Sequence, residues 1–311
     1  MTNKNFWDLT NRPYTQLKLR ILEEYLQAWA QIFFGAATKH KDWKAWQTIY
    51  YIDCFAGRGK YHKDGKDDVV NGSPLIALEC AQKFNSNPSY KGVKMHCIFI
   101  ENKSNVCRKL IKFCEPYKDK TSFEIYEDKD FNSVIGEILN KTNSHPSFFF
   151  IDPDGIRELK KESVESVVNR RGPTDILLNY IKGGVERIVG LAKKQISANF
   201  GKEGSEKYVK TIKRLTDFYG LNIFEKLDST EKQRLKEWTE SILKSSNLKE
   251  VAVFDMPYAH KSDNIYYLLF ASKKPVAKKI ILQIFGKAKK LTYTGQMTLD
   301  SDSFGKSRFE L

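Results

Sequence analysis

The feature that most constrains the fold of this chain is the alternation of short, continuous apolar segments with amphipathic ones. Strands are expected at 48–55, 95–102, 147–155 and 174–181, with another inside 122–131, and helices are expected at 73–84, 104–117 and 131–141. Strands that are apolar on both faces are typical of a parallel sheet covered by helices on each side. The sequence therefore predicts an α/β fold with a doubly wound, Rossmann-like sheet.

The two ends of the chain add elements to this sheet. Residues 14–34 predict an amphipathic helix, because Leu19, Leu22 and Leu26 recur at spacings of three and four. Residues 249–256 and 264–274 predict a closing pair of strands, the last one antiparallel. The predicted organisation is an N-terminal helical segment at 1–46, the sheet domain at 47–183 and 246–285, a helical insertion at 184–245, and a basic tail at 286–311.

The charge of the chain indicates a polyanionic partner. The 311 residues carry a formal net charge of +14. Residues 271–290 contain seven lysines and no acid, and residues 180–214 contain nine Lys or Arg against three Glu. Basic surfaces of this kind favour contact with nucleic acid. The alternative is a lysine-rich surface that only keeps the protein soluble.

Composition also bears on location and metal binding. No apolar run is long enough to span a bilayer, and the first twelve residues have no apolar signal core, so a cytoplasmic protein is expected. The five cysteines are odd in number and form no CxxC pair, which favours reduced thiols. A zinc site from His96, Cys97, Cys107 and Cys114 is conceivable, but small buried side chains are the favoured interpretation, and no metal is expected.

Polar and glycine residues gather where the predicted strands end. In doubly wound sheets a ligand binds beyond the carboxyl ends of the strands, at the point where the strand order reverses. The candidates there are Asp53, Phe55, Ala56, Gly57 and Gly59 after the first strand, Glu101 after the second, Asp128 and Asp130 after the third, Asp152, Pro153 and Asp154 after the fourth, and Asn179 on the fifth.

The glycine turn and Glu101 together indicate a ligand that contains adenosine. Glycine lets a ligand approach the backbone, and an acid after the second strand can accept both hydroxyls of a ribose. A phosphate-binding P-loop is excluded, because Tyr61 stands where Ser or Thr would hold magnesium. His62 replaces the third glycine of a dinucleotide fingerprint, so a nucleotide-dependent oxidoreductase is a minor alternative. Asp53 favours a cationic ligand such as S-adenosylmethionine. Asp128 and Asp130 could equally cap the next helix.

The segment SFFFIDPDG places Asp152 at the end of a buried strand. Asp-Pro there resembles the [DNS]-PP-[YF] motif of amino-group methyltransferases, in which the acid or amide holds the target amino group and the aromatic ring stacks on a base. A simple strand-to-loop turn is the alternative. Asp154 stands where the ring belongs, which puts adenine-N6 chemistry in doubt; Phe55, Tyr61 or Phe131 could supply a ring instead.

Five segments carry a resemblance to a known family: WDLTNRPYTQLKLRILEEYLQAW, YIDCFAGRGKY with NGSPLIALE, FIEN, FFFIDPDGIR and DILLNYIKGGVER. They resemble, in order from about residue 7 to 275, the three-Cys-motif partner proteins (TcmP), which are regarded as class I S-adenosylmethionine-dependent methyltransferase-like. The turn DCFAGRGKY also resembles that of the large-subunit rRNA adenine-N6 methyltransferases. The family takes its name from a protein with three cysteines encoded nearby, which is thus an implied partner.

The resemblance implies roles for the strand-end residues. Glu101 would hold the ribose of S-adenosylmethionine, Asp128 or Asp130 would approach the adenine, and Asp152 would lie beside the transferable methyl. The methionine part would be lined by Asp53, Phe55, Ala56, Gly57 and Gly59. A lysine recurs in the N-terminal segment of the family, so Lys18 could face the cofactor or substrate.

These patterns predict an S-adenosylmethionine-dependent methyltransferase acting on nucleic acid, RNA rather than DNA, with a base amino group as one candidate acceptor. The alternative is a non-catalytic protein of the same fold that serves as a partner in a nucleic-acid-associated complex. Residues 60–71 are expected to form a lid or substrate-contacting loop, or else a passive surface loop. Ser73 is expected to cap the following helix and Pro74 to begin it.

Overall fold

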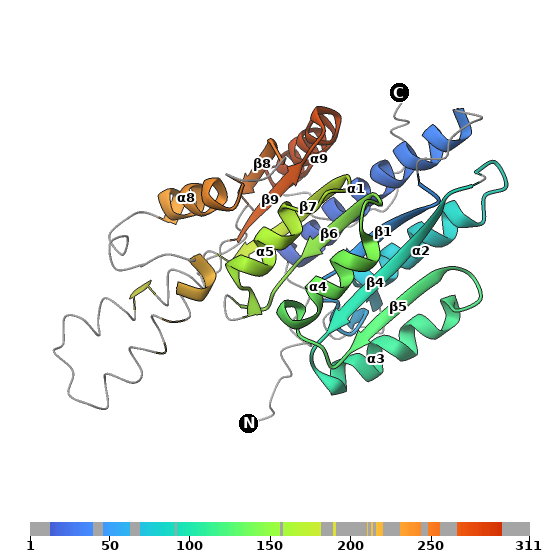
Figure 1. Cartoon of the computed structure of the whole chain (residues 1–311), viewed down its shortest axis with the longest axis horizontal. Coiled ribbons are helices and arrows are strands. Elements are labelled where there is room, and N and C mark those ends of the chain that lie inside the picture. The colour runs from blue at the N-terminus through green and yellow to red at the C-terminus, as the bar shows by residue number, and fades with distance from the viewer. Residues whose placement is uncertain are drawn as a thin grey trace.

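The computed structural model describes residues 13–39, 46–62, 69–90, 92–155, 158–181, 189–190, 210, 213, 216–219, 231–243, 248–255 and 266–293. Seven strands form one sheet in the order β5-β4-β1-β6-β7-β9-β8 (Figure 1). Their bounds are β1 Thr48–Asp53, β4 Lys94–Glu101, β5 Ser122–Glu127, β6 Ser147–Ile151, β7 Thr174–Ile181, β8 Glu250–Asp255 and β9 Tyr266–Ser272.

Strand directions confirm the predicted doubly wound fold. β5, β4, β1, β6 and β7 pair in parallel, whereas β9 is antiparallel to both β7 and β8. From β1 the chain proceeds to β4 and β5 on one side, and then to β6 and β7 on the other. The strand order therefore reverses between β1 and β6, which is where such sheets bind ligands.

Helices cover both faces of the sheet (Figure 1). One face packs against α1, α2 and α9, and the other against α4, α5 and α8. The bounds are α1 Pro13–Lys39, α2 Ser73–Asn85, α3 Ser104–Cys114 with a 3-10 turn at Glu115–Tyr117, α4 Phe131–Thr142, α5 Lys161–Val168, α8 Glu231–Leu243 and α9 Pro275–Tyr293. None of the helices described is long and apolar enough to cross a membrane.

Alternation along the central strands decides which side chains meet α1. Phe148 and Phe150 of β6 belong to the core on the α1 side, as does Leu177 of β7. Because side chains in a strand alternate between faces, the residues two positions after Phe150 and Leu177 point to the same side. These residues are Asp152 and Asn179.

Three parts of the fold differ from the sequence expectations. α9 continues through residue 286, the predicted start of the basic tail, because Ile281, Ile284 and Ala288 repeat at helical spacing and are buried. A short antiparallel hairpin, β2 Lys60–His62 and β3 Val69–Asn71, occupies part of the segment predicted as a loop. α5 was not predicted. α8 falls within the predicted helical insertion, most of which lies outside the described residues.

Candidate active site at the carboxyl edge of the sheet

The glycine turn after β1 is tied to both neighbouring strands. Cys54 N–H donates to the carbonyl of Phe150, and Ala56 N–H donates to that of Ile100, both at 2.9 Å. Gly57 and Gly59 have φ values of 65° and 84°, a conformation that favours glycine. The turn therefore lies at the switch point between β1 and β6, as the sequence predicted.

Asp53 lies beneath this turn and is fully buried. Its carboxylate accepts hydrogen bonds from Tyr51 Oη at 3.2 Å, from Phe55 N at 3.3 Å and from the Ser73 hydroxyl. Burial raises the pKa of Asp53 to about 7, although the bond from Ser73 opposes that rise. Asp53 thus holds the turn from below, where a ligand resting on the turn would not contact it directly.

Ser73 does not have the predicted capping role. The N-cap of α2 is Gly72, and no side chain caps that end of the helix, while Pro74 lies in the first turn as expected. The reason is positional, because Ser73 already has a helical position and its hydroxyl is used by Asp53.

Glu101 lies at the end of β4 and faces the turn from the side. Its Oε2 accepts from Gly57 N at 2.9 Å and its Oε1 from Lys103 N at 2.8 Å. Burial raises the pKa of Glu101, and these two backbone bonds oppose the rise. Each carboxylate oxygen can accept a second bond. Glu101 is therefore held in a fixed orientation with one acceptor position left on each oxygen.

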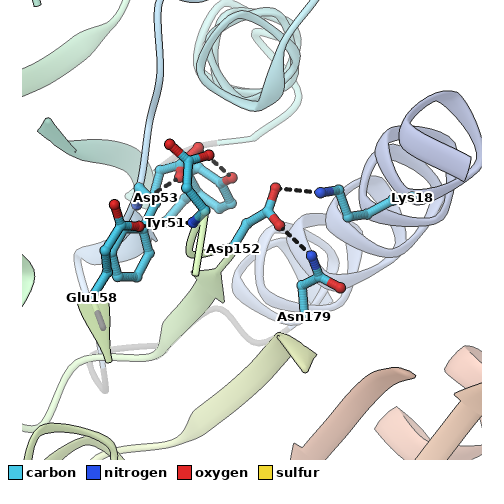
Figure 2. A network of polar contacts seen from close by, with 8 residues as sticks. Lys18, Tyr51, Asp53, Asp152, Glu158 and Asn179 are labelled. Atoms are coloured by element: carbon cyan, nitrogen blue, oxygen red, sulfur yellow. Dashed lines mark hydrogen bonds and ion pairs between the residues drawn. The ribbon is translucent and has the colours of Figure 1, made fainter. Parts of the chain in front are cut away.

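Asp152 lies just beyond β6 and is held from two sides (Figure 2). Lys18 Nζ of α1 contacts Asp152 Oδ2 at 2.5 Å, and Asn179 Nδ2 of β7 donates to Asp152 Oδ1 at 2.7 Å. The side chains of Lys18 and Asp152 are 13% and 21% exposed, so a ligand can reach them. The suggestion that Lys18 faces the site is supported by this contact.

Asn179 had been assigned no role from the sequence. The register of β6 and β7 places Ile151 beside Leu178, so the next residues, Asp152 and Asn179, are neighbours. Asn179 is 4% exposed, and its Oδ1 has no hydrogen-bond partner among the described residues. Its position two residues after inward-facing Leu177 was the signal that could have paired it with Asp152.

Pro153 and Asp154 take the chain away from this cluster. Pro153 is buried. Asp154 Oδ2 pairs with Lys103 Nζ at 2.7 Å, and the Asp154 N–H donates to Glu158 Oε2 at 2.7 Å. Burial and the charge of Asp154 raise the pKa of Glu158. Asp154 is thus engaged with Lys103 on the surface, whereas Asp152 alone of the two acids meets Lys18.

The two acids after β5 take different positions. Asp130 is the N-cap of α4, and its side chain accepts from Asn132 N at 2.9 Å. This is the capping alternative that the sequence left open. Asp128 is exposed and has a left-handed backbone with φ of 54°. The adenine role that the family resemblance implies for Asp128 or Asp130 stays a prediction.

The three rings considered as base-stacking substitutes all pack against protein groups. Phe131 is 1% exposed, and Phe55 is half-buried with its ring centroid 5.5 Å from that of Phe131. Tyr61 of β2 lies beneath the Arg58 guanidinium at 5.8 Å, and a Cβ at Gly72 would come within 2.8 Å of its ring. None of these rings stands open in the position after Asp-Pro.

The hairpin β2–β3 borders the site. Gly72 N–H donates to the carbonyl of Gly59 at 2.7 Å, which closes the hairpin onto the glycine turn. Burial raises the pKa of Tyr61, and the charges of Asp152 and Asp53 raise it further. Residues 63–68, between the two strands, lie outside the described residues, so the lid prediction stays a prediction.

The cysteines are small buried side chains, as expected. Each is free and buried, and burial raises the pKa of the Cys97, Cys107 and Cys114 thiols. Within the described residues, no group of three or more His, Cys, Asp or Glu side chains is placed to hold a metal ion.

The donor set of the site fits S-adenosylmethionine. Glu101 keeps one acceptor position on each carboxylate oxygen for a pair of ribose hydroxyls, and it adjoins a turn with positive φ at Gly57 and Gly59. Asp152 lies near the same turn and its side chain is partly exposed, so its carboxylate could accept a hydrogen bond from an ammonium group.

No family model matches the chain, and no curated protein matches it in sequence. Among solved structures it is similar to a Legionella pneumophila protein of family DUF519, with 13% identity, a TM-score of 0.42, and coverage of 88% of this chain and 92% of that one. It is also similar to Trm1 from Pyrococcus horikoshii in complex with S-adenosyl-L-methionine, with 8% identity, a TM-score of 0.43, and coverage of 87% and 58%.

A third similar structure is the DszA carbon methyltransferase, with 12% identity, a TM-score of 0.38, and coverage of 78% of this chain and 50% of that one. The chain thus spans about half to three fifths of the length of Trm1 and DszA. All three likenesses are distant. The resemblance to the three-Cys-motif partner family stays a prediction.

Proposed function

We propose that this protein is an S-adenosylmethionine-dependent methyltransferase that acts on nucleic acid, RNA rather than DNA. The observation that carries the proposal is the position of Asp152, which Lys18 and Asn179 fix at the switch point. The adjacent glycine turn is bonded to Glu101, because the Gly57 N–H donates to the Glu101 carboxylate. The first acid positions an acceptor and the second offers two places for ribose hydroxyls.

The reaction needs little covalent chemistry from the protein. When bound, S-adenosylmethionine would supply a methyl group for in-line displacement, so the chain mainly has to orient the acceptor and exclude water. Asp152 accepts a hydrogen bond from the acceptor, and Lys18 and Asn179 fix the carboxylate plane. Glu101 would hold the ribose of the bound cofactor. Asp53 stiffens the turn from below through its bonds to Tyr51 and Ser73.

The charge of the chain supports a polyanionic substrate. α9 exposes Lys279, Lys289 and Lys290 and packs against α1, the helix that brings Lys18 to Asp152. Contacts of lysine with phosphate release counterions, so RNA binding should weaken steeply as salt is added. A flat response to salt would count against the nucleic-acid part of the proposal.

A non-catalytic protein of the same fold is the second candidate. It is favoured by Asp154, which pairs with Lys103 where amino-group methyltransferases of the Asp-Pro type carry a ring. In that case the site would bind S-adenosylmethionine without transferring its methyl group. The protein would act as a partner in a complex, for example with the three-cysteine protein that the family resemblance implies.

Transfer of a labelled methyl group separates the two candidates. The full chain is incubated with labelled S-adenosylmethionine and, in separate reactions, total RNA, total DNA and total protein. The proposal expects label in RNA above the level of DNA and protein. Binding of S-adenosylmethionine without label in any acceptor would favour the partner function, and absence of binding would contradict both.

A further inference from the structure

The cluster of Lys18, Asp152 and Asn179 offers a cationic hydrogen-bond donor in addition to the carboxylate that would bind an amino group. Asp152 Oδ2 meets an ammonium group and Asp152 Oδ1 meets an amide, and each oxygen keeps one further acceptor position. The cluster therefore presents a hydrogen-bond acceptor and a cationic donor within 2.5 Å of each other. A substrate group that uses both must be a donor and an acceptor at once.

Amino and hydroxyl groups differ in this respect. An exocyclic amino group of a base presents two N–H donors, and its single lone pair is needed for attack on the methyl carbon. An ammonium placed against that lone pair would oppose the reaction. A hydroxyl has one O–H donor and two lone pairs, so one lone pair can attack while the other accepts a bond from Lys18. The cluster matches the hydroxyl.

The surroundings of the cluster point the same way. Methylation of a base requires a surface on which the extruded base can stack. Asp154 occupies the expected position for such a ring and is paired with Lys103. Phe131 is buried, whereas Phe55 and Tyr61 are half-buried, with Phe131 beside Phe55 and the Arg58 guanidinium over the Tyr61 ring. None of these three residues follows the Asp-Pro pair, where the stacking ring of such enzymes is expected.

We infer that the acceptor is a hydroxyl group, which on a nucleic acid means the ribose 2′-hydroxyl of RNA, with Asp152 as proton acceptor and Lys18 as stabiliser of the developing negative charge. This inference rests on the proposed function and names its acceptor. It also supplies a chemical reason for RNA over DNA, because DNA lacks the 2′-hydroxyl.

The step balances without any further reactant. The 2′-oxygen forms a bond to the methyl carbon as the carbon–sulfur bond of the donor breaks, and the electrons of that bond leave with sulfur as a neutral thioether. The hydroxyl proton passes to Asp152 and from there to water. The Lys18 ammonium lies where charge grows on oxygen, and such fixed charges strengthen their interaction in the transition state.

Alkaline hydrolysis of labelled RNA tests the inference. Alkali cleaves RNA through the free 2′-hydroxyl, so a 2′-O-methyl group leaves its label in alkali-resistant dinucleotides, whereas a methylated base leaves it in mononucleotides. The inference expects label in the dinucleotides. Label in mononucleotides would overturn it and leave the proposed function intact, and label in neither would overturn both.

Lys18→Met tests the role of the ammonium in the same assay. It should lower transfer by about 100-fold or more, while the affinity for S-adenosylmethionine, measured by calorimetry, stays within about threefold. Lys161→Met is a matched control, because Lys161 has the same 13% exposure and pairs with Glu165 on α5. Transfer by Lys18→Met at the level of Lys161→Met would overturn the role of Lys18.

Discussion

Two aspartates on the same face of the sheet, Asp152 and Asp175, are each held by α1 and by a strand, yet they differ in almost every physical respect. Asp175 accepts from Tyr25 Oη at 2.6 Å and from Ser272 Oγ at 2.5 Å. Tyr25 and Ser272 are 1% and 0% exposed. Asp152 instead has a cationic partner and a side chain that is 21% exposed.

The difference shows how one helix can serve both stability and a site. Lys18 and Tyr25 lie seven residues apart on α1, which is two helical turns along one face. Tyr25 contacts Asp175 near the start of β7, and its ring packs edge-on against Phe148 and Phe270. Asp175 is therefore enclosed, whereas Asp152, at the carboxyl end of the neighbouring strand, stays open to a ligand. The buried Asp175 thus fixes the position of α1, and α1 places Lys18 beside the accessible Asp152.

The largest expected effect that separates the two acids is on catalysis. Asp152→Ala should lower methyl transfer by about 10²–10⁴-fold, because the acceptor loses its orienting group and proton acceptor. The free energy of unfolding should change by about 1 kcal/mol or less, since the pair with Lys18 is partly solvated. Labelled transfer and urea denaturation measure the two quantities. Retained transfer would remove Asp152 from the mechanism.

The matched change at the enclosed acid should reverse this pattern. Asp175→Ala leaves the hydroxyls of Tyr25 and Ser272 buried without their acceptor and should lower the free energy of unfolding by roughly 2–4 kcal/mol. Transfer per folded molecule should fall far less than in Asp152→Ala. Urea denaturation at a temperature where both variants are folded provides the comparison. An equal loss of the free energy of unfolding in both variants would contradict the conclusion that Asp175 stabilises the fold more than Asp152 does.

A smaller effect is expected in the pH dependence of stability. Burial raises the pKa of Asp175 to about 6, against about 3.9 in an unfolded chain. Between these pH values the folded state binds more protons, so the free energy of unfolding should fall as pH rises from 4 to 6. The slope from this group is at most about 1.4 kcal/mol per pH unit.

Asp53 adds to the same slope, because its folded pKa of about 7 is also raised by burial. Asp175→Ala should therefore reduce the slope of the free energy of unfolding against pH between pH 4 and 6, and leave the slope between pH 6 and 7 unchanged. Denaturation curves at four pH values would show this. A variant with the same slope as the wild type would mean that Asp175 does not bind a proton on folding.

The positions of the site residues at the strand ends could be predicted from the sequence, because a run of apolar residues stops where a buried strand ends. Four apolar residues before Asp152 and the run before Glu101 fixed both acids at the sheet edge, and the glycine turn followed from spacing. The burial of a side chain at a strand end could not be predicted in the same way. Whether Asp53 faces a ligand or the core depends on its partners, and one of these, Ser73, reaches Asp53 only through the packing of α2 on the sheet.

Long-range partners were the other limit. The contact of Lys18 with Asp152 spans 134 residues, and only the packing of α1 on β6 and β7 brings them together. The sequence also did not decide whether Asp130 caps α4 or whether β2 pairs with β3. Both features depend on local backbone conformations that the residue types allow but do not require. The helix α9 was missed because its lysines dominated the composition of a segment whose apolar residues nevertheless repeat at helical spacing.

The most direct test of the central claim, that the switch point binds S-adenosylmethionine through Glu101, is calorimetric titration of the full chain. The wild type should bind S-adenosylmethionine with one site per chain and should not bind NAD. Glu101→Ala should weaken that binding by about tenfold or more, in line with the loss of hydrogen bonds worth about 1.4 kcal/mol or more. Asp175→Ala should bind like the wild type. Absence of binding by the wild type, or unchanged affinity in Glu101→Ala, would contradict the claim.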